Sequence, residues 1–207
     1  MNTGFFGPPG PDLWVRIRGR TVGAIVCIGF GEYSLYWWNV ATNGGRKAWL
    51  YAITLISAAL LAWSIGQLIA FRYAPRPMLS TQLKRFYRVW FSVIVATEVA
   101  AIVLGAPILA QLQRSDLYAN WVDGVVGLHF FPLGKLFKLP VYYATCAVIS
   151  LAALGSLWLP ESSLRVGVCS GGTGLALWLT GGLILYKNLS SLPPKKTQPD
   201  LPGTNSV

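Results

Sequence analysis

Four ionisable side chains lie inside long apolar stretches of this chain, where ionisable groups are rare. They are Glu32, Glu98, Asp123 and His129. A charged group at the centre of a membrane helix costs about 2.5–3.5 kcal/mol on insertion scales, so such groups tend to turn inward and share hydrogen bonds. No basic residue lies at the depth of Glu32 and Glu98. We therefore expect at least one of these two carboxyl groups to be protonated at neutral pH.

Three of the four residues fall at one depth. Counted from the end of its apolar stretch, Glu32 lies about 12 residues in, Glu98 about 11 and His129 about 10, which is roughly 15–18 Å at 1.5 Å per residue. That is close to the middle of a hydrocarbon core about 30 Å thick. The sequence therefore predicts a proton-binding or ligand-binding site near the membrane centre, with Asp123 as a fourth member nearer the outer face.

Two interpretations of this set stay open. In the first, the three central residues form a hydrogen-bonded clamp between helices, aided by the hydroxyl groups of Thr97 and Ser34. In the second, they form a proton relay or a site for a cationic or polar ligand. Ionisable residues inside a membrane mark functional pathways by default, which favours the second interpretation.

The surroundings of His129 indicate a cavity. Pro132 has no backbone N–H, so the carbonyl of Leu128 loses its helical donor and a kink is expected beside the histidine. Gly127 leaves room on one side. A kink next to an ionisable group, in the least hydrophobic of the apolar stretches, is the best local pointer to a site.

The same region carries a resemblance. The run Val126-Gly-Leu-His-Phe-Phe-Pro-Leu-Gly-Lys-Leu-Phe137, with Thr97-Glu98 before it, resembles a stretch found in small bacterial multi-pass integral membrane proteins. The resemblance covers residues 97–137. It implies no activity, because those proteins have none assigned.

The composition is that of a membrane protein. Of 207 residues, 54% are apolar and 12% charged, and the mean hydropathy is +0.51; a soluble domain carries about twice that share of charge. About 20 apolar residues suffice for a helix to cross the hydrocarbon core. Six stretches meet or approach this length, at 21–40, 48–71, 87–112, 119–136, 139–159 and 166–186. We expect an all-α membrane protein built as a bundle of six transmembrane helices.

The basic residues predict the orientation of this bundle. With the N-terminus in the cytoplasm, thirteen lysines and arginines fall at the inner face and four at the outer face, as the positive-inside rule expects. Without a crossing at 119–136 the division would be nine against eight. The expected organisation is a cytoplasmic segment 1–20, a transmembrane domain 21–186 and a disordered cytoplasmic tail 187–207, in the cell (inner) membrane.

The net charge of +10 fits contact with anionic lipid headgroups. The basic residues are scattered over loops and form no continuous stripe, which argues against nucleic-acid binding.

Small residues predict how the helices pack. Ala58, Ala62, Gly66 and Ala70, at a spacing of four, predict a groove for a neighbouring backbone, and a homodimer through such a face is an alternative. The run Ser170–Gly174 indicates either close helix packing or a broken helix that lines a cavity.

We expect no metal and no cofactor. Cys27, Cys146 and Cys169 are isolated and are interpreted as small apolar fillers. Asp123 and His129, six residues apart, lie on different faces of one helix, which argues against a shared metal. The single histidine, without an acid–serine or H-E-x-x-H pattern, excludes the familiar membrane hydrolase layouts.

The function expected from these observations is transport or conduction of a small solute, with proton coupling as an option, around Glu32, Glu98 and His129. One alternative is a structural or accessory subunit whose buried polar residues lock its helices or bind a partner. Another is a lipid-modifying or quinone-linked enzyme. The substrate is not encoded in any motif of the sequence.

Overall fold

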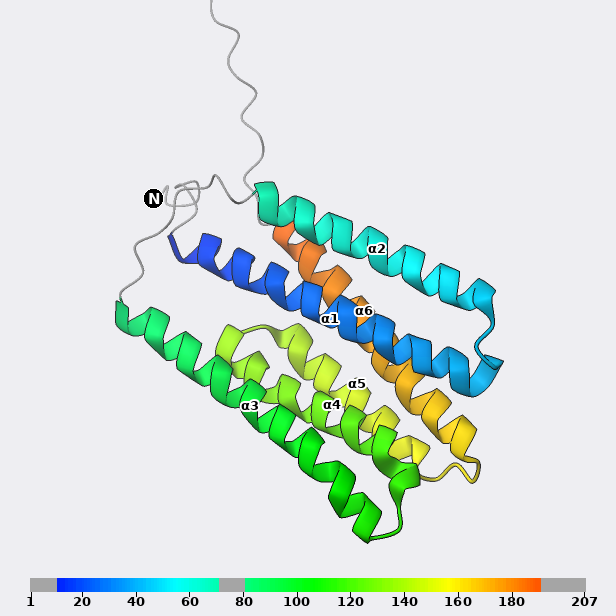
Figure 1. Cartoon of the computed structure of the whole chain (residues 1–207). Coiled ribbons are helices and arrows are strands. Elements are labelled where there is room, and N and C mark those ends of the chain that lie inside the picture. Colours follow the sequence, from blue (N-terminus) through cyan, green and yellow to red (C-terminus); the bar gives the residue numbers. More distant parts are fainter. Residues whose placement is uncertain (1–10, 71–80, 191–207) are drawn as a thin grey trace, which may run out of the picture.

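The computed structural model describes residues 11–70 and 81–190, in which six α-helices run alternately in opposite directions (Figure 1). They are α1 (Pro11–Asn43), α2 (Lys47–Ala70), α3 (Thr81–Gln111), α4 (Tyr118–Phe137), α5 (Pro140–Ser156) and α6 (Ser162–Ser190), with a short 3-10 helix, η3 (Ser115–Leu117), before α4. The described residues contain no strand. The predicted all-α class is confirmed, and each apolar stretch coincides with one helix.

Two helices extend beyond the predicted transmembrane domain 21–186. α1 begins at Pro11, inside the expected cytoplasmic segment, and α6 ends at Ser190, inside the expected tail. The backbone hydrogen bonds of a helix do not require apolar side chains, so a helix can continue past its apolar part. The prediction of a disordered tail from residue 187 is wrong for its first four residues, where Asn188 is fully buried. The predictions for 1–10 and 191–207 fall outside the described residues.

Three helices are long and apolar enough to cross a membrane. They are α2, the part of α3 from Arg85 to Gln111, and α6. α5 is apolar but has only 17 residues, while α1 and α4 carry the ionisable residues described above. These lengths and compositions indicate a membrane protein.

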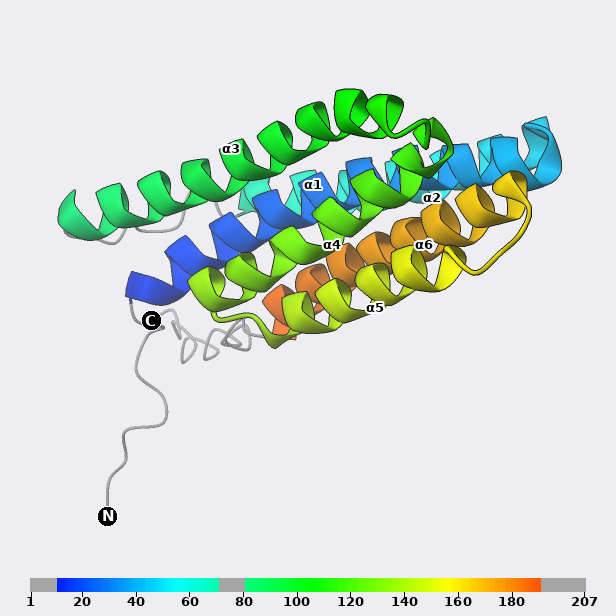
Figure 2. The ribbon, with the colours of Figure 1, turned by 90° about the horizontal axis from the view of Figure 1, so that it is seen from below.

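The core lies around α6. This helix packs against α1 and α5 and also contacts α2 and α4, and 61% of its most apolar window is buried, against 6% for α3. Ile28, Ile149, Leu177 and Leu185 belong to the buried apolar cluster at its centre, each at most 1% exposed. α3 contacts α4 and lies at an edge of the bundle in both views (Figures 1 and 2). The structure therefore has a tightly packed part around α6 and a peripheral helix.

Glycines allow α1 and α6 to approach closely. A Cβ atom at Gly174 would lie 2.9 Å from the carbonyl oxygen of Gly31, and one at Gly181 would lie 3.3 Å from that of Ala24. α6 continues as one helix through the run Ser170–Gly174. The packing interpretation of this run is confirmed, and the alternative of a broken helix is wrong.

The small-residue stripe of α2 does not pack as predicted. Ala58, Ala62, Gly66 and Ala70 are all exposed, and nothing lies within 4 Å of a Cβ atom built at Gly66. α2 instead buries Ile53 and three polar residues, Ser57, Ser64 and Gln67. The spacing of small residues did not identify a packed surface in α2, because spacing cannot say whether a neighbouring helix of the same chain lies opposite.

One exposed ion-pair cluster joins the connection between α3 and α4 to the start of α6. Asp116 accepts hydrogen bonds from Arg165 at 2.6 Å and from Arg114 at 3.4 Å. Desolvation raises the pKa of Asp116, but the hydrogen bonds and charges of these arginines outweigh it and hold the pKa below its ordinary value. Such surface pairs add little stability on their own.

Candidate functional site

Glu98 and His129 meet between two neighbouring helices. Glu98 lies in α3 and His129 in α4, and His129 Nδ1 lies 3.3 Å from Glu98 Oε1. The same nitrogen lies 3.1 Å from the carbonyl oxygen of Val126, one turn earlier in α4. The side chains of the pair are 15% and 14% exposed. A carboxylate and the single imidazole of the chain are thus in contact.

Small residues and one tryptophan fix the register of the pair. Trp121 of α4 donates a hydrogen bond from Nε1 to the carbonyl oxygen of Ala101, at 2.9 Å. A side chain at Gly105 would collide with the same indole ring. Ala101 and Gly105 follow Glu98 by about one and two helical turns.

The contacts of the imidazole limit what it can do. Nδ1 faces two oxygen atoms, so a proton on Nδ1 can be donated to Glu98 or to Val126. In the part of the chain that the structure describes, the other ring nitrogen, Nε2, has no hydrogen-bond partner. A proton can therefore be exchanged with the carboxylate on one side of the ring, while the second nitrogen stays available to accept or release another.

The structure does not bring Glu32 to this pair. Glu32 lies in α1 and is half-buried, and among residues 11–70 and 81–190 no hydrogen bond or ion pair joins it to Glu98 or His129. α1 packs mainly on α6 and α2, whereas α3 packs on α4. Equal depth placed the three residues in one layer of the membrane, but depth says nothing about which helices are neighbours.

The hydroxyl groups expected to aid the pair do not join it. Thr97 donates to the carbonyl oxygen of Val93 in its own helix, at 2.9 Å. Ser34 is buried in α1, the helix that carries Glu32. Neither hydroxyl group therefore takes part in the contact between Glu98 and His129.

Asp123 belongs to a second polar cluster, between α4 and α6. It is buried, and its Oδ2 accepts a hydrogen bond from Cys169 Sγ at 2.9 Å. The hydroxyl group of Thr173 lies beside the same carboxyl group. Six residues of α4 separate Asp123 from His129, which is about 9 Å along the helix. The interpretation of Cys169 as an apolar filler is wrong, because its thiol is the hydrogen-bond donor of a buried acid.

Buried amides form further contacts that the sequence analysis did not single out. Asn188 Nδ2 donates to Thr21 Oγ1 at 3.1 Å and to Gln67 Oε1 at 3.2 Å, which joins α6 to α1 and α2. Asn120 donates to Ser156 Oγ and to the carbonyl oxygen of Ala153, which joins α4 to α5. A search for uncharged amides within or beside apolar stretches, as well as for charges, would have found them. These contacts act as clamps between helices.

Gly127 has a different role from the one predicted. A Cβ atom there would lie 3.0 Å from Ile149 Cγ2 and from Ser150 Oγ of α5. The room beside His129 is therefore filled by α5, and Gly127 serves helix packing rather than a cavity. α4 continues as one helix from Tyr118 to Phe137 with Pro132 inside it, and the expected kink stays a prediction.

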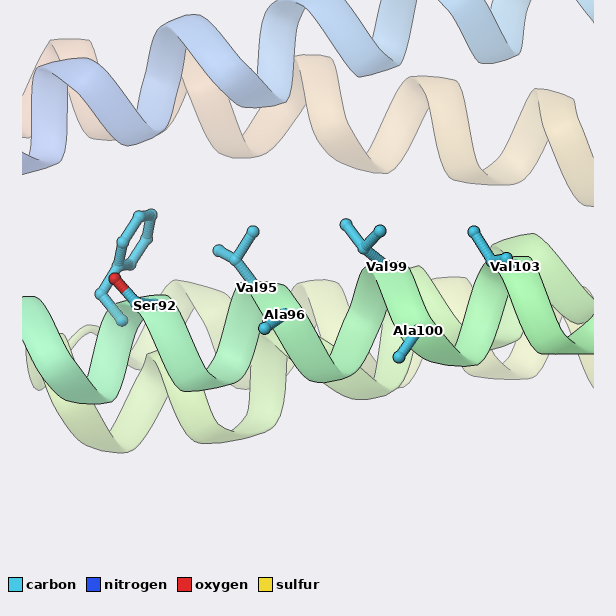
Figure 3. A pocket seen from close by; sticks show the side chains of 7 residues that line it. Ser92, Val95, Ala96, Val99, Ala100 and Val103 are labelled. Carbon is cyan, nitrogen blue, oxygen red and sulfur yellow. The ribbon is translucent and has the colours of Figure 1, made fainter.

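An open groove follows α3 near the pair. It has a volume of about 610 Å³, and seven α3 residues line it (Figure 3): Phe91, Ser92, Val95, Ala96, Val99, Ala100 and Val103. Neither Glu98 nor His129 is among them. The groove is almost entirely apolar, so it suits an acyl chain or another apolar group and not a polar solute.

Metal ligation is not offered by the described residues, which hold no group of three or more His, Cys, Asp and Glu side chains that could bind an ion. No family model, curated protein or solved structure matches this chain. What the protein does must therefore be inferred from the geometry of the pair and its surroundings.

Proposed function

We propose that this protein transports or conducts a small solute across a membrane, and that the Glu98–His129 pair is its proton-binding site. The observation that carries the proposal is the 3.3 Å contact between an acid and an imidazole on two helices. Intramembrane ionisable groups are costly, and in transporters and pumps they commonly form proton relays. The pair also lies in the less tightly packed part of the bundle, since α3 is peripheral.

The chemistry of the proposed site is a proton exchange. A proton on Glu98 can pass to His129 Nδ1, or return from it, across one hydrogen bond. The change of charge alters how strongly α3 and α4 attract one another at this level. Movement of the peripheral α3 relative to α4 would then couple protonation to access from one side of the membrane.

The topology that supports this proposal has six crossings with both termini in the cytoplasm of the inner membrane. α1 and α4 have 33 and 20 residues, so they reach about 50 and 30 Å at 1.5 Å per residue. The alternating directions of the helices (Figure 1) and the bias of basic residues to one face agree with it. A cysteine introduced at Lys138, between α4 and α5, should be labelled by an impermeant reagent only from the cytoplasmic side; labelling from outside would refute the topology.

Flux through the reconstituted protein tests the function. Liposomes containing a pH-sensitive dye would report proton entry under an imposed membrane potential, for the wild type and for Glu98→Gln and His129→Ala. We expect both substitutions to abolish flux, and Glu161→Gln, at an exposed loop carboxylate, to leave it unchanged. Unchanged flux in both site variants would refute the role of the pair. Absence of proton or solute flux in the wild type under all conditions would refute transport.

A second candidate function is a non-transporting accessory subunit, and a specific observation favours it. Buried amides join separate helices at two places in the bundle, through Asn188 and through Asn120. If the Glu98–His129 contact is one more clamp of this kind, Glu98→Gln and His129→Ala would lower thermal stability or release a copurifying partner. A lipid-modifying or quinone-linked enzyme is the third candidate, and a quinone or lipid product copurifying at stoichiometric amounts would support it.

A further inference from the structure

The groove runs along one flank of α3, on the side where the ribbons of α1 and α6 run in Figure 3, but no residue of those helices lines it. Val95, Val99 and Val103 project to the same side of the helix (Figure 3), and all of the residues that line the groove come from α3 itself. The opposite side of the groove is therefore open. In the α3 span, 6% of the most apolar window is buried, so this face meets whatever surrounds the protein.

Two arginines extend the groove face toward the N-terminal end of α3. Positions 85, 88, 92, 95 and 99 follow alternating steps of three and four, which places them on one face of the helix. Arg85 and Arg88 are exposed. Among the described residues, neither arginine forms an ion pair with a carboxylate. One continuous face thus carries two positive charges at one end and an apolar groove along the rest.

The dimensions of this face fit a lipid. From Phe91 to Val103 the groove covers twelve residue steps, or about 18 Å. Half of a hydrocarbon core of about 30 Å is about 15 Å, so the groove is slightly longer than one leaflet. Phe86 and Trp90, on another face at the same end of α3 as the arginines, are half-exposed aromatic residues typical of the headgroup level. The arginines therefore lie where the phosphate of a lipid would be.

We propose that an anionic phospholipid of the cytoplasmic leaflet binds to this face of α3. One acyl chain lies along Val95, Val99 and Val103, and the phosphate group lies between Arg85 and Arg88. Paired cations next to an apolar membrane-facing surface are a recurring way to hold anionic headgroups. A symmetric, parallel contact with a second copy fits less well, because it would bring the arginines of both copies together. The proposal stands whether or not the protein transports a solute.

Native mass spectrometry of the purified protein tests the arginines. The protein in detergent is titrated with phosphatidylglycerol or, separately, with phosphatidylcholine, and the retained lipid is counted. We expect the wild type to retain one phosphatidylglycerol in preference to phosphatidylcholine. Each arginine near a charged lipid surface contributes roughly fivefold, so Arg85→Gln with Arg88→Gln should weaken retention about 25-fold. Arg46→Gln with Lys47→Gln removes the same charge at exposed positions of the α1–α2 connection and should have no effect.

A second variant tests the groove separately. Val99→Trp fills it and leaves both arginines in place, and it should also abolish retention of phosphatidylglycerol, whereas Leu151→Trp, on the exposed face of α5, should not. All of these positions are exposed, so the fold is not at risk. Equal retention of the two lipids, or retention that neither set of variants weakens, would overturn the proposal in favour of non-specific boundary lipid. Dimers that form without lipid and that Val99→Trp dissociates would overturn it in favour of a second copy.

Discussion

Substitution of Gly174 by alanine tests a close backbone contact between α1 and α6. The added Cβ atom would lie 2.9 Å from the carbonyl oxygen of Gly31, which is backbone and cannot rotate away. α1 and α6 must therefore separate, and overpacking of this kind costs about 1–3 kcal/mol. The same change raises helix propensity by up to about 1 kcal/mol, so the net effect needs a control that shares this gain.

Gly182→Ala supplies that control. Gly182 lies two turns further along α6, and nothing is found within 4 Å of a Cβ atom built there. The difference in stability between the two variants reports the contacts of the added Cβ atom with Gly31 and Leu35 of α1. It should be about 1–3 kcal/mol, or roughly 2–4 °C per kcal/mol for a chain of this size.

The assay is the temperature at which half of the detergent-solubilised protein is lost from the monodisperse peak in size-exclusion chromatography. We expect Gly174→Ala to be lost at a lower temperature than Gly182→Ala. If the two variants are equally stable, α1 and α6 are not in backbone contact at this place, and the explanation given for the glycine run in α6 is refuted.

Three further predictions concern polar contacts. Asn188→Ala removes two interhelical hydrogen bonds and should lower stability by about 1 kcal/mol in chemical unfolding, since such bonds average about 0.6 kcal/mol each in membranes; unchanged stability would contradict the clamp. Cys169→Ala removes the thiol donor of Asp123 and should cost about 1–3 kcal/mol, whereas Cys146→Ala should cost less. Equal costs would contradict the thiol–carboxylate contact. Asp116→Asn should lower stability slightly at neutral pH. Because the pKa of Asp116 is lowered in the folded protein, the stabilities of wild type and variant should converge below about pH 4, as the acid is protonated. A stability difference that persists in acid would contradict the ion pairs of Asp116.

The positions of the six helices could be predicted from apolar stretches alone. Each predicted stretch lies over one observed helix, because continuous apolar length is a strong constraint on chains that cross membranes. The ends were less accurate, and α1 begins ten residues before the apolar stretch, at Pro11. Hydropathy shows where an apolar stretch begins, but it does not show where the backbone hydrogen bonds of the helix end.

The candidate site could be predicted only in part. Depth along each helix correctly brought Glu98 and His129 to one level, and the structure joins them. Depth could not show that Glu32 lies in a helix that packs elsewhere, because the neighbours of a helix depend on packing between helices. Cys169 was missed for a related reason, since its chemistry comes from Asp123 on a different helix. Contacts of this kind are tertiary, and no local pattern encodes them.

The central claim is that Glu98 and His129 are in contact and share protons. Because the chain has a single histidine, protein labelled with ¹⁵N-histidine in lipid nanodiscs gives the NMR signals of His129 alone, and these can be followed through a pH titration. We expect Glu98→Gln to shift the titration midpoint of His129. Glu32→Gln, at a carboxylate that does not contact the pair among the described residues, should leave the midpoint unchanged. Identical titration curves for wild type and Glu98→Gln would contradict it.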